Sequence, residues 1–448
     1  MRSAVHSIFI CICCPVLLAF HSAGLRAQDV NAGSMTRVSC VASKDEYSLY
    51  LPKNYNPATK YPLIIFLDPM ARGDVPVEKY RAVADEQEVI LAGSYESRNF
   101  DPAVSVNAVT AILDDIVKRV KIDGAKIWLA GFSGGARMAA AYALGSDRIS
   151  GLVCCGAGFA DNDLYTNRIT IPFAGIAGYR DMNFEEIISI NELLAERKKE
   201  SILLLFAGGH QWPPPRQLAT AVLWLNKAGS PATGSDTLIA ELGRLTQKDL
   251  SYLAWLQAKE YRKIPVLMTA ADSVINGIEH AKGFAKSKEN FESAMNEERE
   301  YMDGFSFLFS QFVLTEENLP VNDEIWKQKA EKISSFRESR NSYRQLSGER
   351  LFDFSWRLCI EQYQWLMESK QYKQAYKAAR LLLFYPAANL DPDYLMARAA
   401  AGAGDESRCL QHLKQAIKKQ GLAKEKIIQD KLIIALVGRE GVEKLFSN

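Results

Sequence analysis

The chain has few of the residues that support metal, redox or disulfide chemistry. Eight cysteines occur in 448 residues, and three of them lie in an apolar N-terminal segment. The remaining set is odd and sparse, which does not suit a disulfide framework in a protein of this size; it comprises Cys40, Cys154, Cys155, Cys359 and Cys409. The sequence contains no zinc-like Cys/His spacing, no P-loop and no dinucleotide fingerprint. It therefore predicts neither a metal nor a cofactor.

An excess of one charge is also lacking. The chain has 54 Lys and Arg against 53 Asp and Glu, a formal net charge of +1. This balance gives no reason to expect nucleic acid or an anionic membrane surface as a partner. Beyond the N-terminal segment, no run is long and apolar enough to span a bilayer. The length and the 48% hydrophobic content suffice for two or three domains with sizeable cores.

The N-terminus has the pattern of an export signal. Arg2 precedes the apolar run 8–20, and small residues follow at Ala23, Gly24 and Ala27. The run is too short for an ordinary membrane span, so we predict a signal peptide over residues 1–27. The mature protein would then be secreted or periplasmic, without a membrane span. An uncleaved N-terminal anchor is the alternative.

The most informative stretch is 131–135, which reads G-x-S-x-G around Ser133. The apolar run 126–130 before it predicts a short buried strand, and the Ala-rich segment 135–144 predicts a helix. A strand, this motif and a helix together are typical of a nucleophile elbow, a tight turn that exposes the serine above a sheet. The flanking glycines leave room where a Cβ would meet the neighbouring strand and helix.

A nucleophilic serine needs a base and a group that orients the base. His210 is the only histidine within residues 28–228, and it follows the apolar run 202–206. Asp181 lies between Ser133 and His210 after another strand-like run, which makes it the preferred acid. Asp161 and Asp163 are the rivals, because they follow the preceding predicted strand.

Several pieces of the chain match a known superfamily. They are Leu51-Pro52 with Tyr55, the run 61–67, the elbow, Gly178-x-x-Asp181, and Gly209-His210-x-Trp212-Pro213. In these pieces the chain resembles the α/β-hydrolases, and among them the secreted esterase-like branch of polyhydroxybutyrate depolymerases and feruloyl esterases. The resemblance covers about residues 38–228 and implies serine-dependent ester hydrolysis through an acyl-enzyme, without cofactor or metal. It does not define the acyl or alcohol group.

Such an enzyme needs two backbone N–H groups for the oxyanion. The resemblance implies Gly134 as one donor and the loop after the run 61–67 as the other. Many relatives have His-Gly where this chain has Asp68-Pro69. Because proline lacks an N–H, the second donor is predicted to be Met70, with Ala71 as the weaker choice. A structural and a site-shaping role for Asp68 both remain open.

The chain divides into an alternating and a helical part. Strands are predicted near 47–51, 62–67, 89–93, 126–130, 150–155, 171–177 and 201–206, and helices near 76–86, 104–121, 135–144, 184–199 and 215–227. This alternation predicts an α/β fold with a mostly parallel sheet covered on both faces, over residues 28–228. The loop 158–170 is too short for an inserted lid domain. A breaker-rich linker is predicted over 229–235 and an all-α domain over 236–448.

A weak repeat occurs in the helical part. Tyr372, Ala375, Ala379 and Leu382 align with Glu406, Cys409, Leu413 and Ala416 at an offset of 34 residues. This is the tetratricopeptide period, so we predict tetratricopeptide-like helix pairs over 354–420. An ordinary helical domain is the alternative. A repeat of this kind would offer a surface for a protein partner.

Three functions are compatible with these patterns. The preferred one is an exported serine hydrolase acting on carboxylic esters of small or polymer-linked substrates. The second is a serine peptidase on the same fold, because only the pocket would differ. The third is a helical-repeat binding protein in which the hydrolase-like part is a scaffold.

Overall fold

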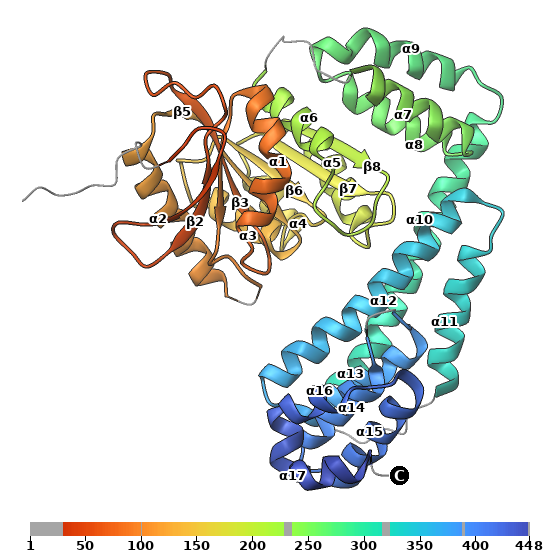
Figure 1. The fold of residues 1–448 in the computed structure, drawn as a ribbon. Coiled ribbons are helices and arrows are strands. Elements are labelled where there is room, and N and C mark those ends of the chain that lie inside the picture. The colour runs from red at the N-terminus through yellow and green to blue at the C-terminus, as the bar shows by residue number, and fades with distance from the viewer. Residues whose placement is uncertain (1–29, 100, 228–234, 316–322, 388–389, 447–448) are drawn as a thin grey trace, which may run out of the picture.

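The computed structural model describes residues 30–99, 101–227, 235–315, 323–387 and 390–446. The predicted signal peptide, and the predicted linker up to residue 234, lie outside this part. A sheet-containing region occupies the first half of the chain and a helical region the second half (Figure 1). Within the described part, no helix combines the length and apolar character needed to cross a membrane.

The first region is built on one eight-stranded sheet with the order β1-β2-β4-β3-β5-β6-β7-β8. β1 pairs antiparallel with β2, and β2 pairs antiparallel with β4. All other neighbours are parallel. The strands are β1 (Met35–Ser39), β2 (Glu46–Tyr50), β3 (Tyr61–Leu67), β4 (Ile90–Ser94), β5 (Ile122–Phe132), β6 (Gly151–Cys155), β7 (Phe173–Gly178) and β8 (Ser201–Phe206).

Six helices accompany this sheet. They are α1 (Asp74–Gln87), α2 (Pro102–Arg119), α3 (Gly134–Leu144), α4 (Asn162–Arg168), α5 (Phe184–Glu196) and α6 (Pro215–Leu225). The predicted fold class, a mostly parallel α/β sheet with helices on both faces followed by an all-α region, is confirmed. All seven predicted strands and all five predicted helices are present. The prediction missed β1 and the short α4, which lies inside the predicted loop 158–170.

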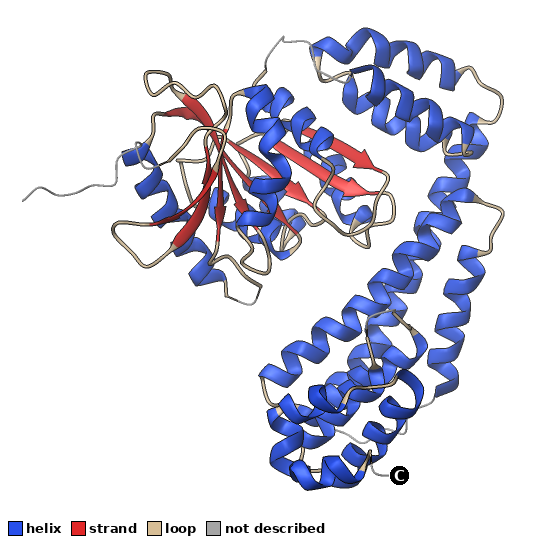
Figure 2. Ribbon diagram, viewed as in Figure 1, coloured by secondary structure: helices blue, strands red, loops and turns tan. Residues whose placement is uncertain are grey.

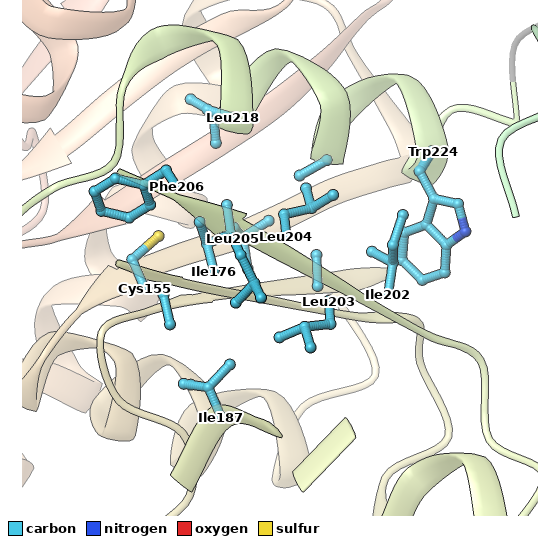
Figure 3. Packing of buried hydrophobic residues seen from close by; sticks show 14 of the residues in the cluster. Cys155, Ile176, Ile187, Ile202, Leu203, Leu204, Leu205, Phe206, Leu218 and Trp224 are labelled. Atoms are coloured by element: carbon cyan, nitrogen blue, oxygen red, sulfur yellow. The ribbon is translucent and has the colours of Figure 1, made fainter. Parts of the chain in front are cut away.

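Helices on both sides explain why the strands read as continuous apolar runs. Along β3, Ile64 and Phe66 point into one core, which also contains residues of α1 and α6. Leu63, Ile65 and Leu67 point into a second core, which contains residues of α2 and α3. Figure 3 shows part of the first core, where β8 lies between residues of α5 and α6.

Helices alone form the region after the sheet (Figure 2). They form an arc beside the sheet-containing region, with α7 to α9 near β8 and α13 to α17 at the far end (Figure 1). The helices are α7 (Ser235–Gln247), α8 (Ser251–Tyr261), α9 (Met268–Glu279), α10 (Phe284–Phe309), α11 (Asp323–Arg337), α12 (Ser342–Glu368), α13 (Tyr372–Leu381), α14 (Pro392–Gly402), α15 (Glu406–Gln420), α16 (Lys424–Gln429) and α17 (Lys431–Lys444).

The positions of the predicted repeat fall on two of these helices. α13 and α15 begin at Tyr372 and Glu406, the two residues aligned at the 34-residue offset. The other aligned residues are all completely buried; they are Ala375, Ala379, Leu382, Cys409, Leu413 and Ala416. The partner helices differ, because α12 has 27 residues and α14 has 11. The tetratricopeptide-like character therefore stays a prediction.

The first hydrophobic core continues across the predicted domain boundary. It joins Phe206 of β8 and Leu218 of α6 to Leu242 of α7 and Ala254 of α8. Polar side chains of α8 also bond to the outer edge of β8. Gln257 accepts a hydrogen bond from the Leu205 N–H at 2.5 Å and donates to the Leu203 carbonyl at 3.1 Å. α7 to α9 thus cover an edge strand that would otherwise expose unpaired backbone groups.

Candidate active site

Ser133 sits in the tight turn between β5 and α3. Its backbone has φ 52° and ψ −124°, a conformation that non-glycine residues rarely adopt and that costs energy. A Cβ on Gly131 would lie 2.3 Å from the Gly135 carbonyl oxygen, and one on Gly135 would lie 2.0 Å from the Leu67 carbonyl oxygen. The glycines of the motif are therefore required by the close approach of strand β5, helix α3 and strand β3.

Ser133, His210 and Asp181 form one hydrogen-bonded chain. Nε2 of His210 lies 2.9 Å from Oγ of Ser133, and Nδ1 lies 2.9 Å from Oδ1 of Asp181. The side chains of His210 and Asp181 are 2% and 1% exposed. A carboxylate on Nδ1 fixes the tautomer in which Nε2 accepts the serine proton.

The two rival carboxylates lie elsewhere. Asp161 caps α4 by accepting a hydrogen bond from the Leu164 N–H at 2.9 Å. Asp163 is 83% exposed and pairs with Arg197 at 2.9 Å. Neither is among the hydrogen-bond partners of His210 in the described residues.

The segment after β7 carries Asp181 in a well-fixed turn. The Asp181 N–H bonds to the Gly178 carbonyl at 3.0 Å, and the Arg180 N–H bonds to the Gly208 carbonyl at 2.9 Å. Oδ1 of Asp181 also accepts the Asn183 N–H at 2.9 Å. The Asp181 loop, residues 179–183, is thus tied directly to the loop that carries His210.

The loop around His210 is anchored by the residues that follow it. The Trp212 indole N–H donates to Oδ2 of Asp68 at 2.9 Å, and the Tyr80 hydroxyl donates to the Pro213 carbonyl at 2.8 Å. The ring of Phe132, next to the nucleophile, lies 4.7 Å from the imidazole centroid. Asp68 is completely buried and therefore has a structural role that connects the β3 loop to the histidine loop.

The predicted oxyanion donors differ in their availability. The Gly134 N–H begins α3 and has no hydrogen-bond partner within the described ranges. The Met70 N–H donates to Oδ1 of Asp68 at 2.9 Å, and this bond competes with an oxyanion role. Asn99, which the sequence analysis missed, bonds through its N–H to the Pro69 carbonyl at 2.9 Å. A Cβ on Gly134 would lie 1.8 Å from the Asn99 side-chain oxygen, so Asn99 lines the same corner.

Helix α12 of the helical region brings charge to this site. Burial raises the pKa of Asp353, Asp181 adds to the rise, and Arg357 and His210 oppose it. Burial likewise raises the pKa of Glu361, again opposed by Arg357 and His210. Arg357 donates to Asp353 at 2.8 Å. These three residues recur every four positions, so they share one face of α12.

A metal site would need several ligating side chains close together in the described part of the chain. The described residues contain no group of three or more His, Cys, Asp or Glu side chains arranged to hold an ion. The five described cysteines are all buried and free. Burial also raises the pKa of Cys40 to about 11, which makes a reactive thiolate unfavourable.

Comparisons with known proteins add structural likenesses at low identity. No protein-family model and no curated protein sequence matches the chain. The solved structures similar to it include Est1E from Butyrivibrio proteoclasticus, at 15% identity and a TM-score of 0.35, covering 42% of this chain and 95% of that one. S-formylglutathione hydrolase FrmB from Staphylococcus aureus has 13% identity and a TM-score of 0.36, and the match covers 44% of this chain and 98% of that one. A ferulic acid esterase has 18% identity and a TM-score of 0.34, and the match covers 42% of this chain and 93% of that one.

Proposed function

We propose that the protein is a serine hydrolase of carboxylic esters that acts through an acyl-enzyme. The observation that carries the proposal is the chain of two 2.9 Å hydrogen bonds from Asp181 through His210 to Ser133. Nucleophile, base and orienting acid are the three parts that acyl transfer requires. The strained backbone of Ser133 supports the same role, because such strain gathers at functional residues.

In the proposed reaction, Oγ of Ser133 attacks the ester carbonyl while Nε2 of His210 takes its proton. Asp181 stabilises the imidazolium that results. The Gly134 N–H binds the developing oxyanion, and the second donor is Met70 once its bond to Asp68 is released or shared. His210 then protonates the alcohol leaving group. Water then attacks the acyl carbonyl while His210 takes its proton, and the bond to Oγ breaks as His210 returns that proton to Ser133, which frees the acid.

We also propose that the protein is exported and that its helical region can bind a partner protein. The first proposal rests on the signal-like N-terminal sequence, and the second on the paired helices α12 to α15. Metabolic labelling of a signal-peptide variant, with the Ala23 to Ala27 segment altered, would show whether the mature protein still reaches the extracytoplasmic fraction.

The hydrolase proposal is tested with a panel of p-nitrophenyl esters and peptide p-nitroanilides. We expect ester turnover by the wild type, and a loss of about 10³- to 10⁶-fold in kcat for both Ser133→Ala and His210→Ala. The double variant should lose little more, because the two side chains act as one unit. A fluorophosphonate probe should label Ser133 in the wild type and should label neither Ser133→Ala nor His210→Ala.

His280→Ala is the matched control, because His280 is exposed and its Nδ1 bonds to the Asn276 carbonyl in the helical region. Its activity should equal that of the wild type. Near-normal ester turnover in either site variant would disprove the assignment. Turnover of the anilides in preference to the esters would instead identify a peptidase.

A further inference from the structure

The helical region reaches the Asp181 loop through one buried arginine, Arg350 on α12. Nη1 of Arg350 donates to the Tyr179 carbonyl at 2.7 Å, which bridges 171 residues of sequence. The Arg350 guanidinium also lies over the Phe184 ring at 4.6 Å. Tyr179 and Phe184 are close to the two ends of the loop that holds Asp181, so a single side chain contacts both ends.

The other donors of Arg350 are used within the helical region. Nε donates to Oε1 of Glu298 on α10 at 2.7 Å, and Nη2 donates to Oε2 of Glu298 at 2.5 Å. Nη2 also donates to Ser347 at 2.9 Å. The Arg350 side chain is 3% exposed and that of Glu298 is completely buried. A planar guanidinium held by a two-point carboxylate contact has a fixed orientation, so the donor aimed at Tyr179 is fixed as well.

The bond to Tyr179 completes the fixation of one peptide unit. The carbonyl of this peptide unit belongs to Tyr179 and accepts the hydrogen bond from Arg350. The N–H of the same unit belongs to Arg180 and donates to the Gly208 carbonyl. A rotation of this peptide would break both bonds at once. The unit lies directly before Asp181 and is bonded to the loop that carries His210. The position of the acid relative to the base therefore depends on a bond from the helical region.

An ion pair also ties the neighbouring start of α5 to α10. Glu185, in the first turn of α5, pairs with Arg299, whose Nε lies 2.7 Å from Oε1. From the opposite side, Arg137 of α3 donates to Glu186 at 2.7 and 2.9 Å. The start of α5 is thus held between the elbow helix and the helical region. Ion pairs of this kind add little stability on balance, so their effect is mainly on geometry.

We propose that Arg350 is a positioning residue, through which the helical region holds Asp181 in hydrogen-bonding geometry with His210. The proposal rests on the serine hydrolase function proposed above. Arg350 does not touch the reacting atoms; it acts through the Tyr179–Arg180 peptide. A misplacement of about 1 Å in a catalytic group can cost about 100-fold in rate, so a single bond of this kind can control turnover.

The test uses the full-length chain with Arg350→Met and Arg350→Lys, and with Arg344→Met as the matched control. Arg344 lies on the same helix and pairs with Glu297 of α10, the residue next to Glu298, at 2.9 Å. Its guanidinium also lies over the Phe336 ring of α11, so both contacts are within the helical region. For a small acetate ester we expect kcat to fall about 10- to 100-fold in Arg350→Met with KM nearly unchanged. The kcat of Arg350→Lys should fall less than that of Arg350→Met, and Arg344→Met should keep the wild-type kcat.

Two readouts separate positioning from general damage. In an Asp181→Asn background, Arg350→Met should cause little further loss, because both changes act on the same group. Hydrogen exchange of the Arg180 amide should quicken about tenfold or more in Arg350→Met and stay unchanged in Arg344→Met. If Arg350→Met does not fold, Arg350→Lys is judged by the same two readouts.

The proposal is overturned if folded Arg350 variants keep the wild-type kcat and exchange rate. It is also overturned if Arg350→Met lowers kcat by as large a factor in the Asp181→Asn background as in the wild type. Should the wild type show no Ser133-dependent hydrolysis, the proposed function has failed, and the Arg180 exchange rate alone decides whether Arg350 fixes the loop.

Discussion

Two of the contacts between the helical region and the sheet-containing region differ in chemistry. At β8 the contact is largely apolar, and the strand N–H groups of Leu203 and Leu205 donate to side chains of α8. At the Asp181 loop the contact is polar: Arg350 donates to the Tyr179 carbonyl, and Arg299 pairs with Glu185 just after the loop. Burial of apolar area and satisfied backbone groups contribute to stability, whereas oriented ion pairs contribute mainly to geometry.

Because of this difference, we expect substitutions at the two contacts to change different properties of the protein. Changes at the β8 contact should lower the free energy of unfolding and leave the chemistry of the remaining native protein intact. Replacing Asp181 itself should lower turnover and leave the free energy of unfolding nearly unaffected, whereas Arg350→Met also leaves the buried Glu298 carboxylate unpaired and should lower both. Three further predictions, beside those for Ser133, His210 and Arg350, test this separation.

The largest effect is expected at the acid itself. Asp181→Asn should lower kcat about 10³- to 10⁴-fold, because an amide favours the wrong tautomer of His210. The melting temperature should change by only a few degrees, since the size and shape of the side chain are kept. Asp163→Asn is the control, because Asp163 is exposed and pairs with Arg197 instead. A reversed result, with Asp163→Asn inactive, would move the acid to the loop after β6.

An intermediate effect is expected at the edge of β8. Glu260 accepts the Leu203 N–H at 2.8 Å and Gln257 accepts the Leu205 N–H at 2.5 Å. Replacing either acceptor leaves a buried N–H without a partner, which costs about 1–3 kcal/mol. Gln257→Leu and Glu260→Leu should therefore each lower the free energy of unfolding by this amount, measured by urea denaturation.

The control for the edge is Lys259→Ala, on the exposed side of the same helix. Lys259 lies 4.4 Å from the Trp255 ring centroid, and such a contact is worth about 0.5–1 kcal/mol. The kcat of both edge variants should match the wild type below their melting temperatures. A large loss of kcat in a folded edge variant would show that the two contacts are coupled.

The smallest effect, a change in the free energy of unfolding, is expected when the charge of Glu361 on α12 is removed. Burial raises the pKa of Glu361 above its ordinary value of 4.5. The folded protein therefore binds this proton more tightly than the unfolded chain, and the resulting stability is lost as pH rises through the folded pKa. Glutamine carries no charge at any pH, so Glu361→Gln avoids the cost of burying the ionised carboxylate. Near pH 7 the free energy of unfolding of the variant should therefore exceed that of the wild type by less than about 1 kcal/mol.

The difference between Glu361→Gln and the wild type should vanish below about pH 4.5, where the carboxyl is protonated in both states. Thermal unfolding across pH measures it, with the exposed Glu368→Gln as a control on the same helix. A stability difference that is constant with pH would contradict the prediction.

Local signals explain what the sequence could predict. The elbow is encoded in five consecutive residues, because the glycines around Ser133 meet backbone atoms of neighbouring elements. The predicted strands were recognisable because both faces of the sheet are covered, which makes them continuously apolar. β1 was missed because only Val38 of its five residues is buried, so its pattern is weak.

Contacts between distant segments could not be predicted. Gln257 meets Leu205 across 52 residues, and Arg350 meets Tyr179 across 171. Nothing in the sequence around Arg350 distinguishes it from the other arginines of α12. Asn99 had a positional signal, because it follows the carboxyl end of β4, where parallel strands bring their loops together. The domain division at 228 was read from composition, which does not reveal that one core extends across it.

The cover of β8 by α8 has a consequence for the order of synthesis. The ribosome makes β8 first, and Gln257 follows Leu205 by 52 residues. At about 5–20 residues per second, roughly 3–10 s pass before the helix that completes this strand exists. During that interval the nascent chain has an apolar edge with open backbone groups, which is a template for misassociation. Completion of the β8 edge must therefore wait for a segment that contributes none of Ser133, Asp181 and His210.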